Sequence, residues 1–148
     1  MRGGGREVKE LKRKNCKITA IDLDKDMIEQ SKRIEPNAEY IEGDFLNFRR
    51  KNYYDYIVCL FNTVNYLDKA QRIELINLAF YNLKKGGQLI INTVDLSYNP
   101  LRLLLSNLKH HSMYYYFPQE SRLWFKDVNF RKIEIVKVET SKLIVAKK

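Results

Sequence analysis

The sequence predicts an α/β fold, a three-layer sandwich around a mostly parallel β-sheet that closes with an antiparallel strand pair. Three observations lead to this prediction. Strand-like and helical patterns alternate along the 148 residues, as in sheets covered by helices on both faces. Two segments, Tyr54–Phe61 and Gln88–Val94, are almost continuously apolar, which is typical of buried strands in a parallel sheet, and we expect Tyr54–Phe61 to be buried on both faces. At the C-terminus, Arg131–Val138 and Ser141–Ala146 are joined by a turn of about two residues, which makes them antiparallel neighbours.

The first third of the chain contains four short elements in alternation. We expect a helix at Arg6–Lys14, a strand at Lys17–Ile21, a helix at Asp24–Arg33 and a strand at Ala38–Glu42. The second of these helices places Met27, Ile28 and Ile34 on its inner face. Pro36 ends it, because proline cannot continue a helix.

A long helix follows the Tyr54–Phe61 strand. Asp68 begins it, and Gln71 lies three residues later in the arrangement of a capping box. Its apolar positions recur at helical spacing and are Ile73, Ile76, Phe80 and Leu83. Gly86-Gly87 is expected to end the helix, since glycine takes the positive φ that a helix C-terminus favours. Two further helices are expected at Pro100–Leu108 and Gln119–Lys126, on either side of the aromatic stretch Tyr114–Phe117.

Length and composition limit the class of protein. The chain is long enough for one domain over residues 1–148 with its own core. No apolar run approaches the roughly 18 residues of a membrane helix, and Met1–Gly5 lacks the apolar stretch of a secretory signal, so we expect a cytoplasmic protein without a membrane partner. Cys16 and Cys59 are expected to be reduced core thiols, not a disulfide or metal ligands. The net charge of +9 allows a nucleic-acid partner, but a lysine-rich solvated surface is the simpler interpretation.

Glycines and carboxylates at predicted strand ends are candidate ligand contacts, because α/β folds bind ligands beyond the carboxyl ends of their strands. Gly3-Gly4-Gly5 opens a helix, where free backbone amides attract anionic groups. Asp22 ends a strand, and a carboxylate there accepts both hydroxyls of a ribose. The alternative is that Asp22, Asp24 or both only cap the helix that follows.

Two later motifs are less informative alone. In Gly43-Asp44-Phe45, the glycine permits a tight turn, Asp44 offers an acceptor for an adenine amino group, and Phe45 offers an apolar wall. A Gly-Asp pair is also ordinary turn punctuation. Leu83–Ile91 (Leu-Lys-Lys-Gly-Gly-Gln-Leu-Ile-Ile) terminates a helix and leads into a buried strand, which implies no ligand role.

The order and spacing of these motifs resemble the class I S-adenosylmethionine-dependent methyltransferases. Gly3–Glu7 resembles the last half of the family's glycine loop, and Asp22 matches the acid that holds the ribose. Gly43–Phe45 is similar to the segment that contacts adenine, Tyr54–Val58 to the fourth strand, and Leu83–Gly87 is the most specific match. The resemblance covers nearly the whole chain. An NAD-dependent Rossmann enzyme shares the glycine loop and the acid, but it does not predict the other features.

This resemblance implies a Rossmann-like fold, S-adenosylmethionine as cofactor and methyl transfer by in-line displacement, helped by positioning and exclusion of water. The implied cofactor contacts are Gly3, Gly4, Gly5, Asp22, Leu23, Asp44, Phe45 and Phe61. The residues expected on the acceptor side are Asn62, Asn65, Tyr66 and Tyr115, although capping and packing explain them equally well. Enzymes that methylate base amines carry an Asn/Asp-Pro-Pro-aromatic motif at this place, which Phe61–Val64 does not match.

The acceptor class is therefore open between three hypotheses. A small-molecule acceptor is the leading one. The second is an RNA- or protein-modifying methyltransferase that uses the basic surface. The third is a shortened, non-catalytic domain that acts as a partner protein.

The sequence departs from the family at its first strand, which precedes the glycine loop and lies between strands two and four of the sheet. Only Met1 and Arg2 stand there. Without that strand, Lys17–Ile21 and Tyr54–Phe61 each expose an unpaired edge, which is costly and prone to aggregation. Three explanations are open: a chain recorded from a late start, which we favour, a strand exchanged in a homodimer, or direct pairing of the two strands.

Overall fold

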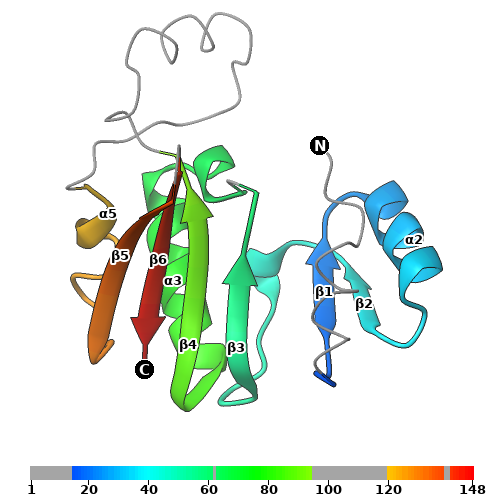
Figure 1. Cartoon of the computed structure of the whole chain (residues 1–148), viewed down its shortest axis with the longest axis horizontal. Helices are drawn as coiled ribbons and strands as arrows, with labels where there is room; N and C mark the ends of the chain where they lie inside the picture. The colour runs from blue at the N-terminus through cyan, green and yellow to red at the C-terminus, as the bar shows by residue number, and fades with distance from the viewer. Residues whose placement is uncertain (1–14, 62, 95–119, 139–140) are drawn as a thin grey trace, which may run out of the picture. The chain divides into compact units, whose positions relative to one another are not determined.

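The computed structural model describes residues 15–61, 63–94, 120–138 and 141–148, and the chain divides into two compact units, Met1–Phe48 and Arg49–Lys148. In the first unit, β1 (Thr19–Asp22) and β2 (Glu39–Glu42) pair in parallel, and α2 (Lys25–Ile34) connects them (Figure 1). A 3₁₀-helix, η1 (Phe45–Asn47), follows β2. These elements confirm the predicted strand–helix–strand order. The helix predicted at Arg6–Lys14 lies outside the described residues.

Local interactions define both ends of α2. Asp24 is its N-cap and accepts hydrogen bonds from the amides of Asp26 and Met27. At the other end, the Tyr40 hydroxyl donates to the carbonyl oxygens of Ser31 and Glu35 at 2.9 and 2.8 Å. Ile28 is buried as predicted, but Ile34 is exposed. The prediction for Ile34 was wrong because it is the last residue of the helix, and helical spacing alone does not tell whether a terminal turn is covered.

The second unit contains a four-stranded sheet of order β3-β4-β6-β5. Its strands are β3 (Tyr54–Cys59), β4 (Leu83–Thr93), β5 (Lys132–Val138) and β6 (Ser141–Lys147). β3 and β4 are parallel, and β6 is antiparallel to both β4 and β5, as predicted for the C-terminal pair. The helical segments are η2 (Thr63–Tyr66), α3 (Lys69–Asn82) and α5 (Glu120–Leu123). The α/β fold class is thereby confirmed.

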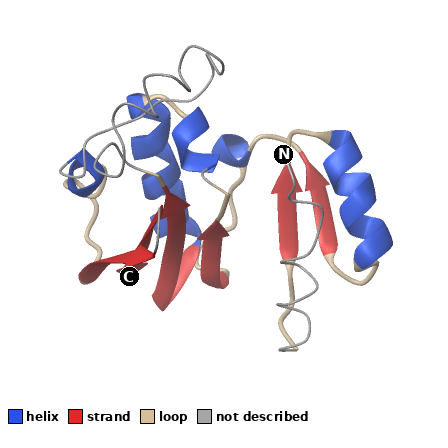
Figure 2. Cartoon of the chain, turned by 45° about the horizontal axis from the view of Figure 1, so that its top comes forward, coloured by secondary structure: helices blue, strands red, loops and turns tan. Residues whose placement is uncertain are grey.

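The core of this unit lies between α3 and one face of the sheet (Figure 2). Its most deeply buried apolar residues are Val64, Ile76, Ala79, Leu83, Leu89, Ile91, Ile144 and Ala146. The other face is less covered: Tyr56 and Val58 of β3 are 61% and 39% exposed. The expectation that this strand is buried on both faces was wrong, because alternate side chains of β3 lie on the face away from α3.

The structure confirms the capping box at the start of α3, where the Gln71 amide donates to Asp68 and the Asp68 amide donates to the Gln71 side chain, both at 2.9 Å. The helix ends at Asn82, earlier than predicted. Leu83 takes an extended backbone, and Lys148, distant in sequence, caps this end: its ammonium donates to the carbonyl oxygens of Phe80 and Leu83 at 2.6 and 2.7 Å. Gly86 does take a positive φ of 83°, but within the first part of β4.

Three other expectations are tested in the described part of the chain. The helix predicted at Gln119–Lys126 is short, with only Glu120–Leu123 helical, and Pro100–Leu108 lies outside the description. Cys16 is exposed, so it is not a core thiol, whereas Cys59 is partly buried; neither forms a disulfide. β1 belongs to the two-stranded sheet of the first unit and β3 to the four-stranded sheet of the second. No helix among the described residues is long and apolar enough to cross a membrane.

Candidate functional site

The carboxyl ends of β1 and β2 bring two of the predicted site motifs together. In the parallel register Asp22 lies opposite Glu42, and the Gly43 amide donates to the Asp22 carbonyl oxygen at 2.9 Å. Asp44 is therefore the second residue beyond the end of β2, at the same edge of the sheet as Asp22. Neighbouring strand ends of this kind are where α/β folds bind ligands.

Asp22 and Asp24 have different roles in this turn. Asp24 caps α2, whereas Asp22 accepts one hydrogen bond, from the Asp24 amide to its Oδ1 at 3.0 Å. The Asp22 side chain is exposed, and its Oδ2 has no partner in the part of the chain that the structure describes. Leu23 beside it is 72% exposed. Capping thus accounts for Asp24, and Asp22 keeps a carboxylate oxygen and an apolar neighbour for a ligand.

Asp44 is partly committed to the fold. Its Oδ1 accepts from the Leu46 amide at 2.9 Å and caps η1. This oxygen therefore has the structural role expected of an ordinary Gly-Asp turn. Phe45 is half-buried. The expected need for glycine at position 43 is not met, because Gly43 has no positive φ and a Cβ there would meet no atom within 4 Å.

Phe61 follows the carboxyl end of β3 with an unusual backbone. Its φ is 55°, in the left-handed region that bulky residues rarely adopt, and its side chain is 48% exposed. The turn is closed by the Thr63 amide and hydroxyl, which donate to the Leu60 carbonyl oxygen at 3.2 and 2.7 Å. Strain of this kind concentrates at ligand sites.

Asn65 is fully buried, and its side chain holds the segment after β3 to the end of β4. Its Nδ2 donates to the Val94 carbonyl oxygen at 3.0 Å, and its Oδ1 accepts from the Thr93 hydroxyl at 2.9 Å. These contacts favour the alternative interpretation, in which the Asn65 amide satisfies the loop inside the fold, over an acceptor-side role. Thr93 was not identified from the sequence as the partner of Asn65; its position at the end of a predicted strand was the only indication in the sequence.

A buried arginine supports the same segment. Arg72 of α3 donates from Nε to the Val64 carbonyl oxygen at 3.1 Å, and its guanidinium lies 5.2 Å from the Trp124 ring centroid. Neither residue was singled out from sequence, since Arg72 follows the charged pattern of a solvated helix face. The hydrogen bond from Arg72 holds the backbone of η2 at Val64.

The one titratable group with a large shift in this region is Cys59, near the end of β3. Burial raises the pKa of its thiol to about 11, against a smaller opposing effect of a backbone hydrogen bond with Val64. The thiol is therefore neutral at physiological pH and not an activated nucleophile. No group of three His, Cys, Asp or Glu among the described residues could hold a metal ion.

Several predicted site residues lie outside the described residues: Gly3, Gly4, Gly5, Asn62 and Tyr115. Tyr66 is half-buried at the end of η2. Asp22, Leu23, Asp44 and Phe45 belong to the first unit, and Phe61, Asn65 and Tyr66 to the second.

Comparison with known proteins identifies relatives by sequence and by fold. The sequence pattern of a family described as "Methyltransferase domain" matches residues 2–87. The carboxy-S-adenosyl-L-methionine synthase of Yersinia enterocolitica is 30% identical over 107 residues, which are 68% of this chain and 40% of that protein. The chain thus spans about two fifths of this curated relative.

Solved structures share the fold at lower identity. A SAM-dependent methyltransferase from Archaeoglobus fulgidus superposes with a TM-score of 0.79 at 16% identity, over 99% of this chain and 82% of that chain. The PH0226 protein from Pyrococcus horikoshii superposes with a TM-score of 0.78 at 17% identity, over 98% of this chain and 79% of that chain.

Proposed function

Since the chain belongs to the methyltransferase-domain family, of the class I S-adenosylmethionine-dependent type, we propose that it transfers a methyl group from S-adenosylmethionine to a small-molecule acceptor. The observation that carries this proposal is the Asp22 carboxylate. It lies at the carboxyl end of a parallel strand, keeps one oxygen open, and is bonded through its backbone to the Gly43-Asp44 turn. The name of the Yersinia relative also supports chemistry on an S-adenosylmethionine compound.

The residues of the first unit fit the nucleoside part of that cofactor. Asp22 would accept hydrogen bonds from the ribose hydroxyls through its open oxygen, and Leu23 and Phe45 would provide apolar contacts for the adenine ring. Asp44 would accept from the adenine amino group with the oxygen that does not cap η1. The glycine run Gly3–Gly5 would supply backbone amides, as its order in the sequence suggests.

The family resemblance assigns the methyl-transfer side to residues that follow β3. When bound, S-adenosylmethionine supplies a methyl group that is activated by its sulfonium. Phe61 would contact the cofactor, and Asn62, Tyr66 and Tyr115 would face the acceptor, while Asn65 holds the supporting loop through Thr93. Their contribution is positioning and exclusion of water. We place this activity in the cytoplasm, because neither cysteine is in a disulfide.

A transfer assay with a methyl-tritiated donor tests the function directly. The purified chain is incubated with the donor and a cell extract, and the products are separated by size. Label in the low-mass fraction supports the proposal. Label in the high-mass fraction that ribonuclease or protease releases indicates the RNA- or protein-modifying alternative. The non-catalytic alternative is indicated if the folded protein transfers no label and shows no heat of binding with the donor or its demethylated product.

A further inference from the structure

The net positive charge of the protein lies in one of its two units. Residues 1–48 carry ten basic and ten acidic side chains, whereas residues 49–148 carry seventeen basic and eight acidic ones. The charge of +9 therefore belongs entirely to the second unit. This distribution differs from the even spread expected of a generally solvated surface.

Within that unit, basic residues gather at one end of the four-stranded sheet. The amino ends of β3, β4 and β5 and the carboxyl end of β6 meet there. The basic residues at this end are Arg50, Lys51, Lys84, Lys85, Arg131, Lys132, Lys147 and Lys148. Backbone bonds join their segments: the Arg131 amide donates to the Lys147 carbonyl oxygen at 2.8 Å, and the Lys148 amide to that of Gly87 at 3.0 Å. We call this set the basic end.

Only part of this charge is used inside the fold. Lys84 pairs with Asp55 at 2.9 Å, Lys132 pairs with Glu134 at 2.7 Å, and the Lys148 ammonium is held by the end of α3. The remaining set of exposed cations, with no acidic partner in the described ranges, is Lys51, Lys85, Arg131 and Lys147. An exposed group of like charges repels itself, and a polyanion relieves that repulsion.

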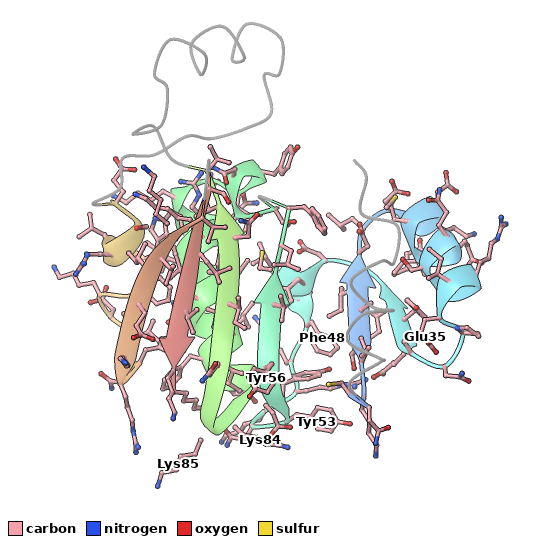
Figure 3. All side chains as sticks on the ribbon, viewed as in Figure 1. Glu35, Phe48, Tyr53, Tyr56, Lys84 and Lys85 are labelled. Carbon is pink, nitrogen blue, oxygen red and sulfur yellow. The ribbon has the colours of Figure 1, made fainter. Side chains whose placement is uncertain are left out.

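Exposed aromatic rings lie beside these cations. Tyr53 is 55% exposed and Tyr56 is 61% exposed, and Figure 3 shows both beside Lys84 at this end of the sheet. The Arg50 guanidinium lies 5.4 Å from the Tyr53 ring centroid, and Tyr54 packs edge-on against the same ring at 4.9 Å. These neighbours hold the Tyr53 ring in place while it remains accessible to a stacking partner.

We propose that the basic end binds single-stranded nucleic acid, with phosphates on the four exposed cations and bases stacked on Tyr53 and Tyr56. Cations that follow a backbone beside exposed aromatic rings are the chemistry by which proteins bind unpaired strands. A duplex does not present its base faces to such rings. The surface lies at the opposite end of β3 from Phe61, a separation of about 20 Å for six residues of strand. Binding there rests on neither the cofactor nor methyl transfer.

Fluorescence anisotropy of the full chain with a labelled oligouridylate of about twelve nucleotides tests this surface. The key variant combines Lys51→Gln, Lys85→Gln and Lys147→Gln. The matched control combines Lys25→Gln, Lys69→Gln and Lys137→Gln, three exposed lysines elsewhere that lower the net charge equally. We expect affinity to fall at least about tenfold in the first variant, with the salt dependence reduced by about two counterions, and to change little in the second. Equal losses in both variants overturn the proposal.

Tyr53→Leu separates recognition of nucleic acid from attraction to any polyanion. We expect it to weaken oligouridylate binding several-fold and to leave heparin binding unchanged. Wild-type protein that binds heparin or anionic vesicles as tightly as the oligonucleotide overturns the assignment to nucleic acid. Circular dichroism melts of each variant confirm that it is folded, and the Tyr53→Phe protein, which keeps the ring, should bind like wild type.

Discussion

The amide of Gly43 donates to the carbonyl oxygen of Asp22 at 2.9 Å, and this one bond ties the ends of two parallel strands together. As a result the Asp22 carboxylate and the Asp44 turn lie at the same edge of the β1–β2 sheet. Residues twenty-two positions apart in the sequence thus become candidates for one nucleoside site.

Asp22→Ala is expected to weaken binding of S-adenosylhomocysteine, the demethylated product, by about ten- to a hundredfold, because hydrogen bonds to a charged acceptor contribute about 1.5–3 kcal/mol. Isothermal titration calorimetry measures the change. Asp24→Ala is the control: it removes the α2 cap and should cost about 1 kcal/mol of stability while leaving the affinity of the folded protein nearly unchanged. Equal loss of affinity in both variants would contradict the ribose assignment.

Asn65→Ala should destabilise the protein by about 2–3 kcal/mol, since it removes, at a fully buried position, the hydrogen bonds with the Val94 carbonyl oxygen and the Thr93 hydroxyl. Urea denaturation measures this. Asn77→Ala, which removes an exposed side chain of α3, is the control and should change stability by less than about 0.5 kcal/mol. Thr93→Val combined with Asn65→Ala should cost less than the sum of the single changes. Strict additivity would show that the two side chains are not coupled.

Phe61→Gly is expected to raise the urea midpoint, because glycine adopts a φ of 55° without the strain of about 1 kcal/mol or more that a bulky residue bears there. The gain is partly offset by the greater freedom of glycine in the unfolded chain. Phe61→Ala keeps the strain and should bring no gain. Asn52→Gly, at a φ of 50°, should change stability less than Phe61→Gly, since asparagine tolerates this region. A midpoint of Phe61→Gly no higher than that of Phe61→Ala, which loses the same ring but keeps the strain, would refute the interpretation.

If Phe61 is retained for ligand binding, both Phe61→Gly and Phe61→Ala should weaken S-adenosylhomocysteine binding. Stability and affinity then respond differently: the urea midpoint rises only with Phe61→Gly, whereas affinity for S-adenosylhomocysteine falls with either change. Unchanged affinity in both variants would remove Phe61 from the cofactor site.

Cys59 and Cys16 should differ in reactivity. Because burial raises the pKa of the Cys59 thiol to about 11, iodoacetamide at mildly alkaline pH should modify exposed Cys16 first and Cys59 only slowly. Mass spectrometry of the digested protein follows both, and unfolding in urea should remove the difference. Rapid alkylation of native Cys59 would contradict its burial.

The same shift gives a pH dependence of known sign. The folded thiol has a pKa above its ordinary value of 9.0, so it binds its proton more tightly than the unfolded thiol does. The stabilisation is fully present below pH 9 and is lost as the pH rises through about 11. Cys59→Ala should show a smaller fall of stability over this window than wild type, and the difference between the two proteins isolates the contribution of the Cys59 thiol.

Short-range patterns determined much of the fold. The Asp68–Gln71 capping box, the start of α2 at Asp24 and the antiparallel pairing of β5 with β6 each depend on residues a few positions apart, so the sequence alone predicts them. The identity of Asp22 as a strand-end carboxylate follows for the same reason. The order of these motifs also predicted the family.

Contacts between distant residues decided the rest. Lys148 caps the end of α3, and Thr93 donates to Asn65, because folding brings together groups separated by dozens of residues. Neither contact has a local signature in the sequence. The basic end arises in the same way: its lysines and arginines stand in four separate pairs along the chain, and only the meeting of four strand ends gathers them on one surface. Periodicity in the sequence indicates which face of a helix or strand is apolar. Only the tertiary structure determines which residues the apolar face and the polar face contact.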